Sequence, residues 1–153
     1  MVKLKRATLV ILIILNCAII IYLSHQPARI SASQSGGISG FITDHLIPGY
    51  NEMPVAEKKV VSKRVDDIVR DVAHGTEYFP LGLLGTVLLG RKRAWLMLLL
   101  VGLFAASDEI HQIWIDGRSA QITDWLKDML GAGVGVLVGS IVGRKRNVNA
   151  VKG

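Results

Sequence analysis

Cysteine is nearly absent from this chain of 153 residues, and aromatic residues make up only 6% of it. The one cysteine, Cys17, excludes an intrachain disulfide, and the residues before it do not include the small side chain expected ahead of a lipidated cysteine. The net charge is +6, but the basic residues sit at the ends of apolar runs and are not interleaved with stacking aromatics. The sequence therefore predicts neither a disulfide scaffold nor a nucleic-acid partner.

Long apolar runs are what the sequence has instead, and half of its residues are hydrophobic. The runs cover residues 7–23, 79–90, 94–107 and 129–143. The last three are shorter than the ~20 residues with which a helix crosses a ~30 Å hydrocarbon core, so neighbouring polar residues must complete each span. The first run has no small-x-small exit and is expected to be an uncleaved helix. We predict an all-α integral membrane bundle, a single domain over residues 1–153 with four transmembrane helices at residues 7–23, 72–90, 94–113 and 124–143.

Basic residues cluster at three places, each beside an apolar run: Lys3, Lys5 and Arg6; Arg91, Lys92 and Arg93; and Arg144, Lys145 and Arg146. If four helices alternate in direction, all three clusters lie on one side, which the positive-inside rule makes the cytoplasm. We therefore expect a multi-pass protein of the cell membrane with both termini in the cytoplasm. Residues 24–70 then form an external loop, although lysines and arginines occur there too, among interleaved acids.

The external loop contains two patterns. Residues 31–40 are rich in serine and glycine and predict an irregular loop, whereas Pro54 suits the first turn of a helix that runs on toward the second span. Val61, Val65, Ile68 and Val72 then form one apolar stripe opposite a charged face. This stripe fits an amphipathic helix on the outer membrane surface and a helix that extends the second span equally well.

Small residues mark one face of the fourth span, where Gly131, Gly135, Gly139 and Gly143 are spaced by four. Such a stripe lets another helix approach closely within the membrane. It suits an intramolecular neighbour as well as it suits a homodimer formed through Gly131, Gly135 and Gly139.

Polar side chains gather near the outer ends of the second, third and fourth spans. Measured from the inner basic clusters at ~1.5 Å per residue, Glu77, Asp108 and Asp128 lie ~21–24 Å up, just inside the edge of the hydrocarbon. An unpaired carboxylate is costly at that depth, so these groups should face one another or a wet pocket. We predict one polar pocket open to the outside, formed by His74, Glu77, Tyr78, Asp108, Glu109, His111, Gln112, Arg118, Asp124 and Asp128.

Helical spacing indicates which members of this pocket can cooperate, because residues three or four apart share a face. Arg118, in the turn after the third span, is the expected counter-ion of the acids, or a clamp for a phosphate or carboxylate ligand. The groups at these spacings are His74 with Glu77 and Tyr78, Asp108 with His111 and Gln112, and Asp124 with Asp128.

These residues resemble the VanZ-like family of small bacterial membrane proteins. The resemblance covers most of the chain from residue 71 to residue 143, and Gly75 and Asp128 stand where the family often has an aromatic residue and an asparagine. It implies a multi-pass cell-membrane protein with a role in resistance to the glycopeptide teicoplanin, without supplying a reaction. The motifs that carry it are His74, Glu77 and Tyr78 with Leu81 and Gly82; Ser107, Asp108, Glu109, Ile110, His111 and Gln112 with Arg118 and Ser119; and Asp124 with Asp128 and Gly131.

Three functions fit the predicted pocket. It is a structural network that holds helix ends together, or it binds a lipid-linked cell-envelope precursor or a lipoglycopeptide at the outer leaflet, with Arg118 on a phosphate or carboxylate. The third alternative is an acid/base or metal-dependent enzyme acting on a lipid head group, with metal ligands from His74, Glu77, Asp108 and His111. Because a helical pair of a histidine and an acid is a weak metal signal, we predict no cofactor and no bound metal. His25 and His45 in the external loop are expected to be solvated.

Overall fold

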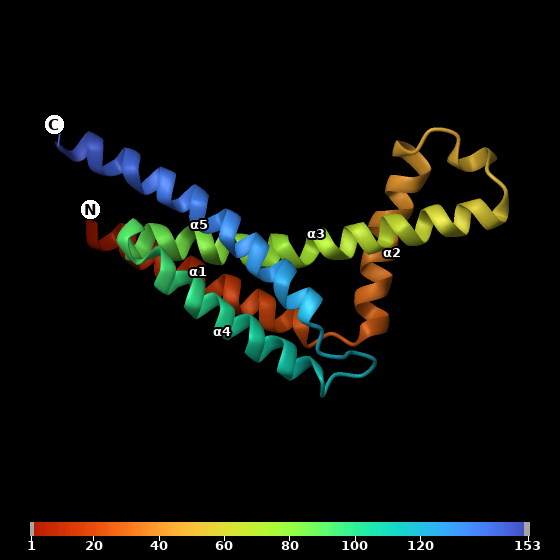
Figure 1. Cartoon of the computed structure of the whole chain (residues 1–153), viewed down its shortest axis with the longest axis horizontal. Coiled ribbons are helices and arrows are strands. Elements are labelled where there is room, and N and C mark those ends of the chain that lie inside the picture. The colour runs from red at the N-terminus through yellow and green to blue at the C-terminus, as the bar shows by residue number, and fades with distance from the viewer. Residues whose placement is uncertain (1, 152–153) are drawn as a thin grey trace.

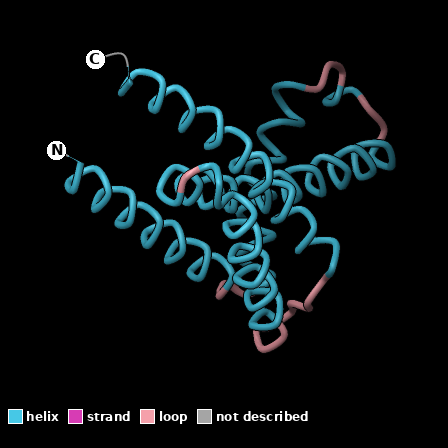
Figure 2. The backbone as a smooth tube through the Cα atoms, turned by 60° about the vertical axis from the view of Figure 1, so that its left-hand side comes forward, coloured by secondary structure: helices cyan, strands magenta, loops and turns pink. Residues whose placement is uncertain are grey.

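The computed structural model describes residues 2–151, and of residues 2–5 and 144–151 only the backbone. This part of the chain is helical and contains no strand. Figure 1 shows four long helices packed as a bundle, α1 (Val2–Ser24), α3 (Val55–Leu89), α4 (Ala94–Gln112) and α5 (Ile122–Val151), with α2 (Ala28–Leu46) crossing at one end. Loops are confined to the helix ends (Figure 2), where two 3-10 turns also lie, η1 (Tyr50–Glu52) and η2 (Arg91–Arg93). The all-α prediction is confirmed.

Both ends of the chain and the turn between α3 and α4 lie at the same end of the bundle (Figure 1). We call the opposite end, where α1 and α4 end and α5 begins, the distal end. Gly90 has φ +85° and lets the backbone reverse from α3 into η2. The basic segments therefore gather at one end, as the sequence predicts. The side chains of Lys3, Lys5 and residues 144–146 lie outside those that the structure describes.

Three segments are long and apolar enough to cross a membrane: Arg6–Ser24, Arg91–Gln112 and Ile122–Gly143. They match the first, third and fourth predicted spans to within a few residues. The second predicted span, residues 72–90, lies in α3 but is not among them, because polar residues at its start dilute a short apolar run. Apolar side chains are exposed on the outward faces, among them Ile14, Leu103 and Leu130. The transmembrane helix at residues 72–90 stays a prediction.

The predicted irregular loop at residues 31–40 is wrong, because these residues belong to α2. Ser35, Ser39 and Thr43 are buried on the face that packs against α3, and their hydroxyls lie 2.9–3.2 Å from the backbone carbonyls three residues earlier. Ser39 Oγ is also 3.3 Å from Asp66 Oδ1 on α3. These contacts satisfy the hydroxyls, and packing against α3 outweighs the low helix propensity of serine and glycine.

The helix after Pro54 runs without a break from Val55 to Leu89, about 52 Å at 1.5 Å per residue. Residues 55–72 therefore extend the second predicted span outward, and the alternative of a separate amphipathic helix on the membrane surface is wrong. Val61 and Val65 of the apolar stripe are partly buried, whereas Ile68 and Val72 are exposed.

The glycine stripe of α5 packs against α3. A side chain at Gly131 would collide with the backbone of Gly75, one at Gly135 with that of Phe79 and one at Gly139 with that of Leu83. The intramolecular alternative is therefore correct. The homodimer through Gly131, Gly135 and Gly139 stays a prediction, and in the single chain α3 covers that face.

The core lies among α1, α3, α4 and α5 and consists of Ile20, Tyr78, Leu81, Met97, Val101, Ala105, Ala132 and Val136. Two hydrogen bonds join helices across it. Asn16 Nδ2 donates to the Glu77 carbonyl at 3.2 Å, and Trp125 Nε1 donates to the Gly102 carbonyl at 3.0 Å. These contacts hold α1 against α3 and α5 against α4, and so position the parts of these helices that carry the predicted polar side chains.

Candidate functional site

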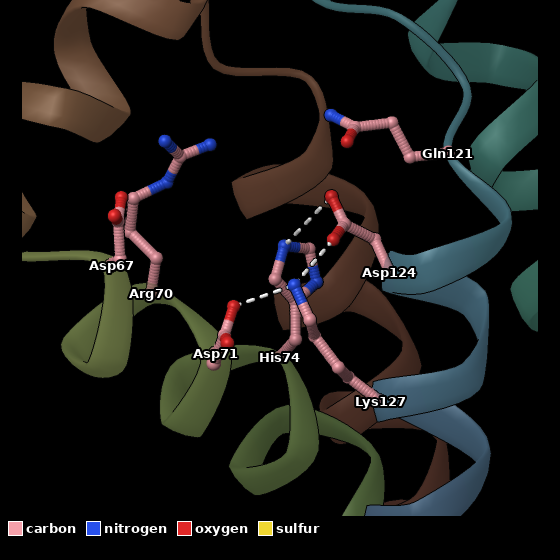
Figure 3. Close-up of a pocket in the computed structure, with 7 residues that line it drawn as sticks. All are labelled: Asp67, Arg70, Asp71, His74, Gln121, Asp124 and Lys127. Atoms are coloured by element: carbon pink, nitrogen blue, oxygen red, sulfur yellow. Dashed lines mark hydrogen bonds and ion pairs between the residues drawn. The ribbon is translucent and has the colours of Figure 1, made fainter. Parts of the chain in front are cut away.

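His74 on α3 lies between two aspartates of α5. Its Nδ1 is 3.3 Å from Asp128 Oδ1, and its Nε2 is 3.7 Å from Asp124 Oδ2 (Figure 3 shows the second contact). The four-residue spacing of the aspartates places both on one face of α5. Because Asp124 is 8% exposed and Asp128 only 1%, the imidazole links a carboxylate near the surface to one deep in the bundle.

Lys127 makes the other ion pairs between these two helices. Its Nζ lies 2.5 Å from Asp71 Oδ1 on α3 and 2.8 Å from Asp124 Oδ1, one turn away on α5. Two carboxylates therefore already neutralise this ammonium group, and Asp124 is shared between Lys127 and His74 (Figure 3).

A second group of polar side chains lies at the distal end of α4. Gln112 Nε2 donates to Asp108 Oδ2 at 3.3 Å and to Glu109 Oε1 at 3.4 Å. The other carboxylate oxygen of Glu109 accepts the backbone N–H of Gln121 at 2.7 Å, just before α5 begins. Glu109 thus joins the end of α4 to the start of α5.

Arg118 folds back over this group from the turn between α4 and α5. Gly117, at φ +72°, permits the turn, and Arg118 donates to Gln112 Oε1 at 3.1 Å and to the Leu23 carbonyl of α1 at 3.3 Å. The pKa of Arg118 is lowered from its ordinary value, mainly because the guanidinium is partly buried. The carboxylates of Asp108 and Glu77 oppose this effect, and the positive charge of Arg70 adds to it. Arg118 makes no ion pair with the described residues. It therefore acts on the acids through space and holds the helix ends by hydrogen bonds.

Two buried groups of the predicted site lack well-formed hydrogen bonds. Among the described residues, no hydrogen bond of regular geometry reaches either oxygen of Asp128 or the Tyr78 hydroxyl, although both residues are 1% exposed and the Tyr78 hydroxyl lies close to the Asp108 carboxylate. The contact between His74 and Asp128 has the distance of an ion pair without the geometry of a hydrogen bond. Unsatisfied buried polar groups are costly, so the burial of the Asp128 carboxylate depends on its contact with the His74 imidazole.

A cavity of about 300 Å³ opens beside His74, between α3 and the start of α5 (Figure 3). Four of the residues that line the cavity belong to the ion-paired network described above: Asp71, His74, Asp124 and Lys127. Asp67 lines the cavity as well but has no ion pair among the described residues. Arg70 on α3 and Gln121 just before α5 also line the cavity, and within the described chain neither side chain has a hydrogen bond or ion pair. The lining residues are Asp67, Arg70, Asp71, His74, Gln121, Asp124 and Lys127.

A family comparison covers all of these elements. A model of the VanZ/LLP1 family matches residues 9–143. The chain belongs to the VanZ/LLP1 family. Neither the curated proteins nor the solved structures include a match. The resemblance drawn from the motifs is confirmed and extends to α1 and α2. Together with the three apolar helices, membership of the VanZ/LLP1 family indicates a membrane protein.

The VanZ/LLP1 structure brings most of the predicted site residues together as two neighbouring groups. Glu77 belongs to neither group by direct contact, but it lies near enough to Arg118 to raise its pKa. Tyr78 is buried in the core and its ring packs at a tilt against Phe104. The first group contains His74, Asp124 and Asp128, and the second contains Asp108, Glu109, Gln112 and Arg118.

His111 lies apart from these groups. Its Nε2 is 3.2 Å from Nδ1 of His25, and the two rings are nearly parallel, with centroids 5.5 Å apart. His25 is exposed as expected, but it also joins the end of α1 to the end of α4. Spacing along one helix contains no signal for a contact across 86 residues.

Five residues that line the cavity were not predicted: Asp67, Arg70, Asp71, Gln121 and Lys127. A signal for three of them was present, because Asp67, Arg70 and Asp71 precede His74 at helical spacings and share its face of α3. Asp67 and Arg70 were assigned to the external loop of residues 24–70, where a helix that extends the second span was one of two alternatives, so these residues were not counted among the pocket residues.

The side chains considered as metal ligands in the enzyme alternative, His74 with Glu77 and Asp108 with His111, do not contact each other in the structure. His74 contacts the aspartates of α5 instead of Glu77, and His111 contacts His25 instead of Asp108. Within the described residues, no group of three or more His, Cys, Asp and Glu side chains is arranged to hold a metal ion.

Proposed function

We propose that this VanZ/LLP1 protein is a multi-pass protein of the cell envelope that binds a lipid-linked precursor or a lipoglycopeptide in the cavity beside His74. In this role it contributes to resistance to glycopeptides such as teicoplanin. The observation that carries the proposal is the pair of side chains without a described partner, Arg70 on α3 and Gln121 just before α5, which line a cavity of about 300 Å³ whose other cations are already paired.

The chemistry of the lining suits a ligand with an anionic group and neutral polar groups. Arg70 has a guanidinium free to bind a phosphate or carboxylate in a bidentate manner, and the Gln121 amide adds a donor and an acceptor. Asp67 has no ion pair among the described residues and can accept hydrogen bonds from sugar or peptide groups. Lipid-linked sugars and lipoglycopeptides combine these groups.

The position of the cavity supports a role at the outer leaflet. The basic segments lie at the end of the bundle that also holds both termini (Figure 1), and the positive-inside rule assigns this end to the cytoplasm. The distal end, with the cavity and the groups around His74 and Arg118, is then external.

Replacement of Arg70 by glutamine is expected to weaken ligand binding about ten- to hundredfold, the effect of losing a hydrogen bond to a charged group. Binding is measured by titrating the purified protein in lipid nanodiscs with teicoplanin, and separately with nanodiscs that contain a polyprenyl phosphate. Arg29→Gln is the matched control, because it removes one exposed arginine from α2 outside the cavity lining. Equal weakening in both variants, or no binding of either probe by the unaltered protein, contradicts the proposal.

Cells that carry Glu109→Gln or Arg118→Ala are expected to become more susceptible to teicoplanin while the protein still accumulates in the membrane. Both substitutions alter the hydrogen bonds that position Gln121 and the start of α5, and so change the cavity wall. Membrane abundance and susceptibility are scored together. If either protein fails to accumulate, the site acts as a structural network and the proposal loses this support.

A further inference from the structure

Helix α2 is oriented differently from every other long helix of the bundle. It runs across the bundle axis at the distal end, while α1, α3, α4 and α5 run along it (Figure 1). Its start is fixed at that level, because the Ala28 N–H donates to the carbonyl of Asp116 in the turn between α4 and α5 at 3.1 Å. If the apolar helices cross a membrane, α2 therefore begins at the level where they leave it.

The faces of α2 differ in a way that a helix in water does not explain. The fully buried residues of α2 are Ser35, Ser39 and Thr43, and among its isoleucines, leucine and phenylalanine only Ile42 is partly buried. Ile30, Ile38 and Phe41 are instead 40%, 56% and 60% exposed. At about 100° per residue, these three fall within one quarter of the helix surface.

A polar strip borders the apolar quarter of α2. Arg29, Ser33, Gly37 and Asp44 fall within about one quarter of the helix surface directly beside it, while Gln34 and His45 fall within the apolar quarter itself. Arg29 and Asp44 are the only Arg, Lys, Asp or Glu residues in α2, whereas the adjoining first half of α3 is densely charged. A helix with few charges and an outward apolar face suits the boundary between head groups and acyl chains.

We infer that α2 is an interfacial helix, with Ile30, Ile38 and Phe41 inserted into the outer leaflet. Lipid is the occupant that the surroundings favour, because exposed apolar side chains continue on the distal ends of neighbouring spans. Tyr22 of α1 is 66% exposed, and Ile113 and Trp114 after α4 are 56% and 73% exposed. Aromatic side chains are enriched at this depth of a membrane.

The helix in this position also restricts what reaches the cavity, a consequence that rests on the proposed function. Ser39 of α2 is 3.3 Å from Asp66 of α3, next to Asp67 and one turn before Arg70 at the cavity. With α2 inserted in the leaflet, the cavity lies at the level of lipid head groups. Its ligand is then anchored in the membrane by an acyl or prenyl chain and presents its phosphate or carboxylate to Arg70.

Site-directed spin labelling tests the inference without any ligand. Nitroxide labels are attached to Phe41→Cys, Ile38→Cys and, as the matched control, Ser33→Cys, each in a Cys17→Ala background. The protein is reconstituted into vesicles of phosphatidylethanolamine and phosphatidylglycerol. Accessibility to oxygen, which concentrates in lipid, is compared with accessibility to a water-soluble nickel chelate.

The labels at Phe41 and Ile38 are expected to have an oxygen-to-nickel accessibility ratio several-fold higher than the label at Ser33. Equal ratios at the three positions show that α2 has no lipid-facing side distinct from the side of Ser33, and overturn the inference. Low accessibility to both reagents at Phe41 and Ile38 shows that protein covers this face, and overturns it too. Since no ligand is present, either outcome leaves the binding proposal to its own test, and loss of teicoplanin binding leaves the position of α2 unaffected.

Discussion

Replacement of Gly131 by alanine is expected to lower the free energy of unfolding by about 1–3 kcal/mol, the usual cost of inserting a methyl group into a filled interface. The Cβ of an alanine there would collide with the carbonyl oxygen of Gly75, which is backbone and has no rotamer to change. Relief requires α3 and α5 to separate, and this pair forms the most extensive helix contact of the described chain. His74 would then move away from Asp124 and Asp128.

Gly133→Ala is the matched control for this prediction. Gly133 lies two residues along the same helix, and an added Cβ there meets nothing within 4 Å. Its stability is expected to stay unchanged or to rise slightly, because alanine has the higher helix propensity. Stability is measured for both variants by titrating the protein in mild micelles with SDS and following helix content. Equal loss in both variants would show that the close approach of α3 and α5 is not what the glycine stripe provides.

The main helices were predictable because their signals are local. Apolar runs bounded by basic residues located three spans to within a few residues, and Pro54 marked the start of α3. Helix α2 was not predictable in this way, because serine and glycine favour a loop when read alone. The buried hydroxyls of Ser35 and Ser39 become acceptable in a helix only once α3 is beside them.

The same distinction applies to the candidate site. Depth counting brought Glu77, Asp108 and Asp128 to one level and so predicted a shared pocket with His74 and Asp124. The structure places His74 in contact with both Asp124 and Asp128. Spacing on one helix did not reveal which partner each group selects. His74 contacts α5, and His111 contacts His25 at the end of α1. The rotation of each helix about its axis decides these contacts, and it is set by packing between helices, such as that of the glycine stripe. Residue spacing within one helix does not encode that rotation.

His74→Ala is expected to destabilise the protein by about 3 kcal/mol, because it leaves the Asp128 carboxylate buried without its one ion-pair partner among the described residues. Asp128→Asn should cost less, since an asparagine carries no charge that needs a partner. The double variant His74→Ala/Asp128→Asn should then be more stable than His74→Ala alone. Unfolding free energies from the same SDS titration of the two single variants and the double variant measure this coupling.

The double variant also separates the structural and binding roles of the site. If the contact between His74 and Asp128 only holds α3 to α5, restoring stability restores teicoplanin resistance as well. If the cavity binds a ligand, the double variant is stable and still weakened in binding, because His74 lines the cavity and keeps Asp124 shared with Lys127. Asp128 does not line the cavity, so Asp128→Asn in the presence of His74 should retain more binding than the double variant. Equal binding by those two proteins would show that His74 contributes stability alone, and the binding role would then rest on Arg70.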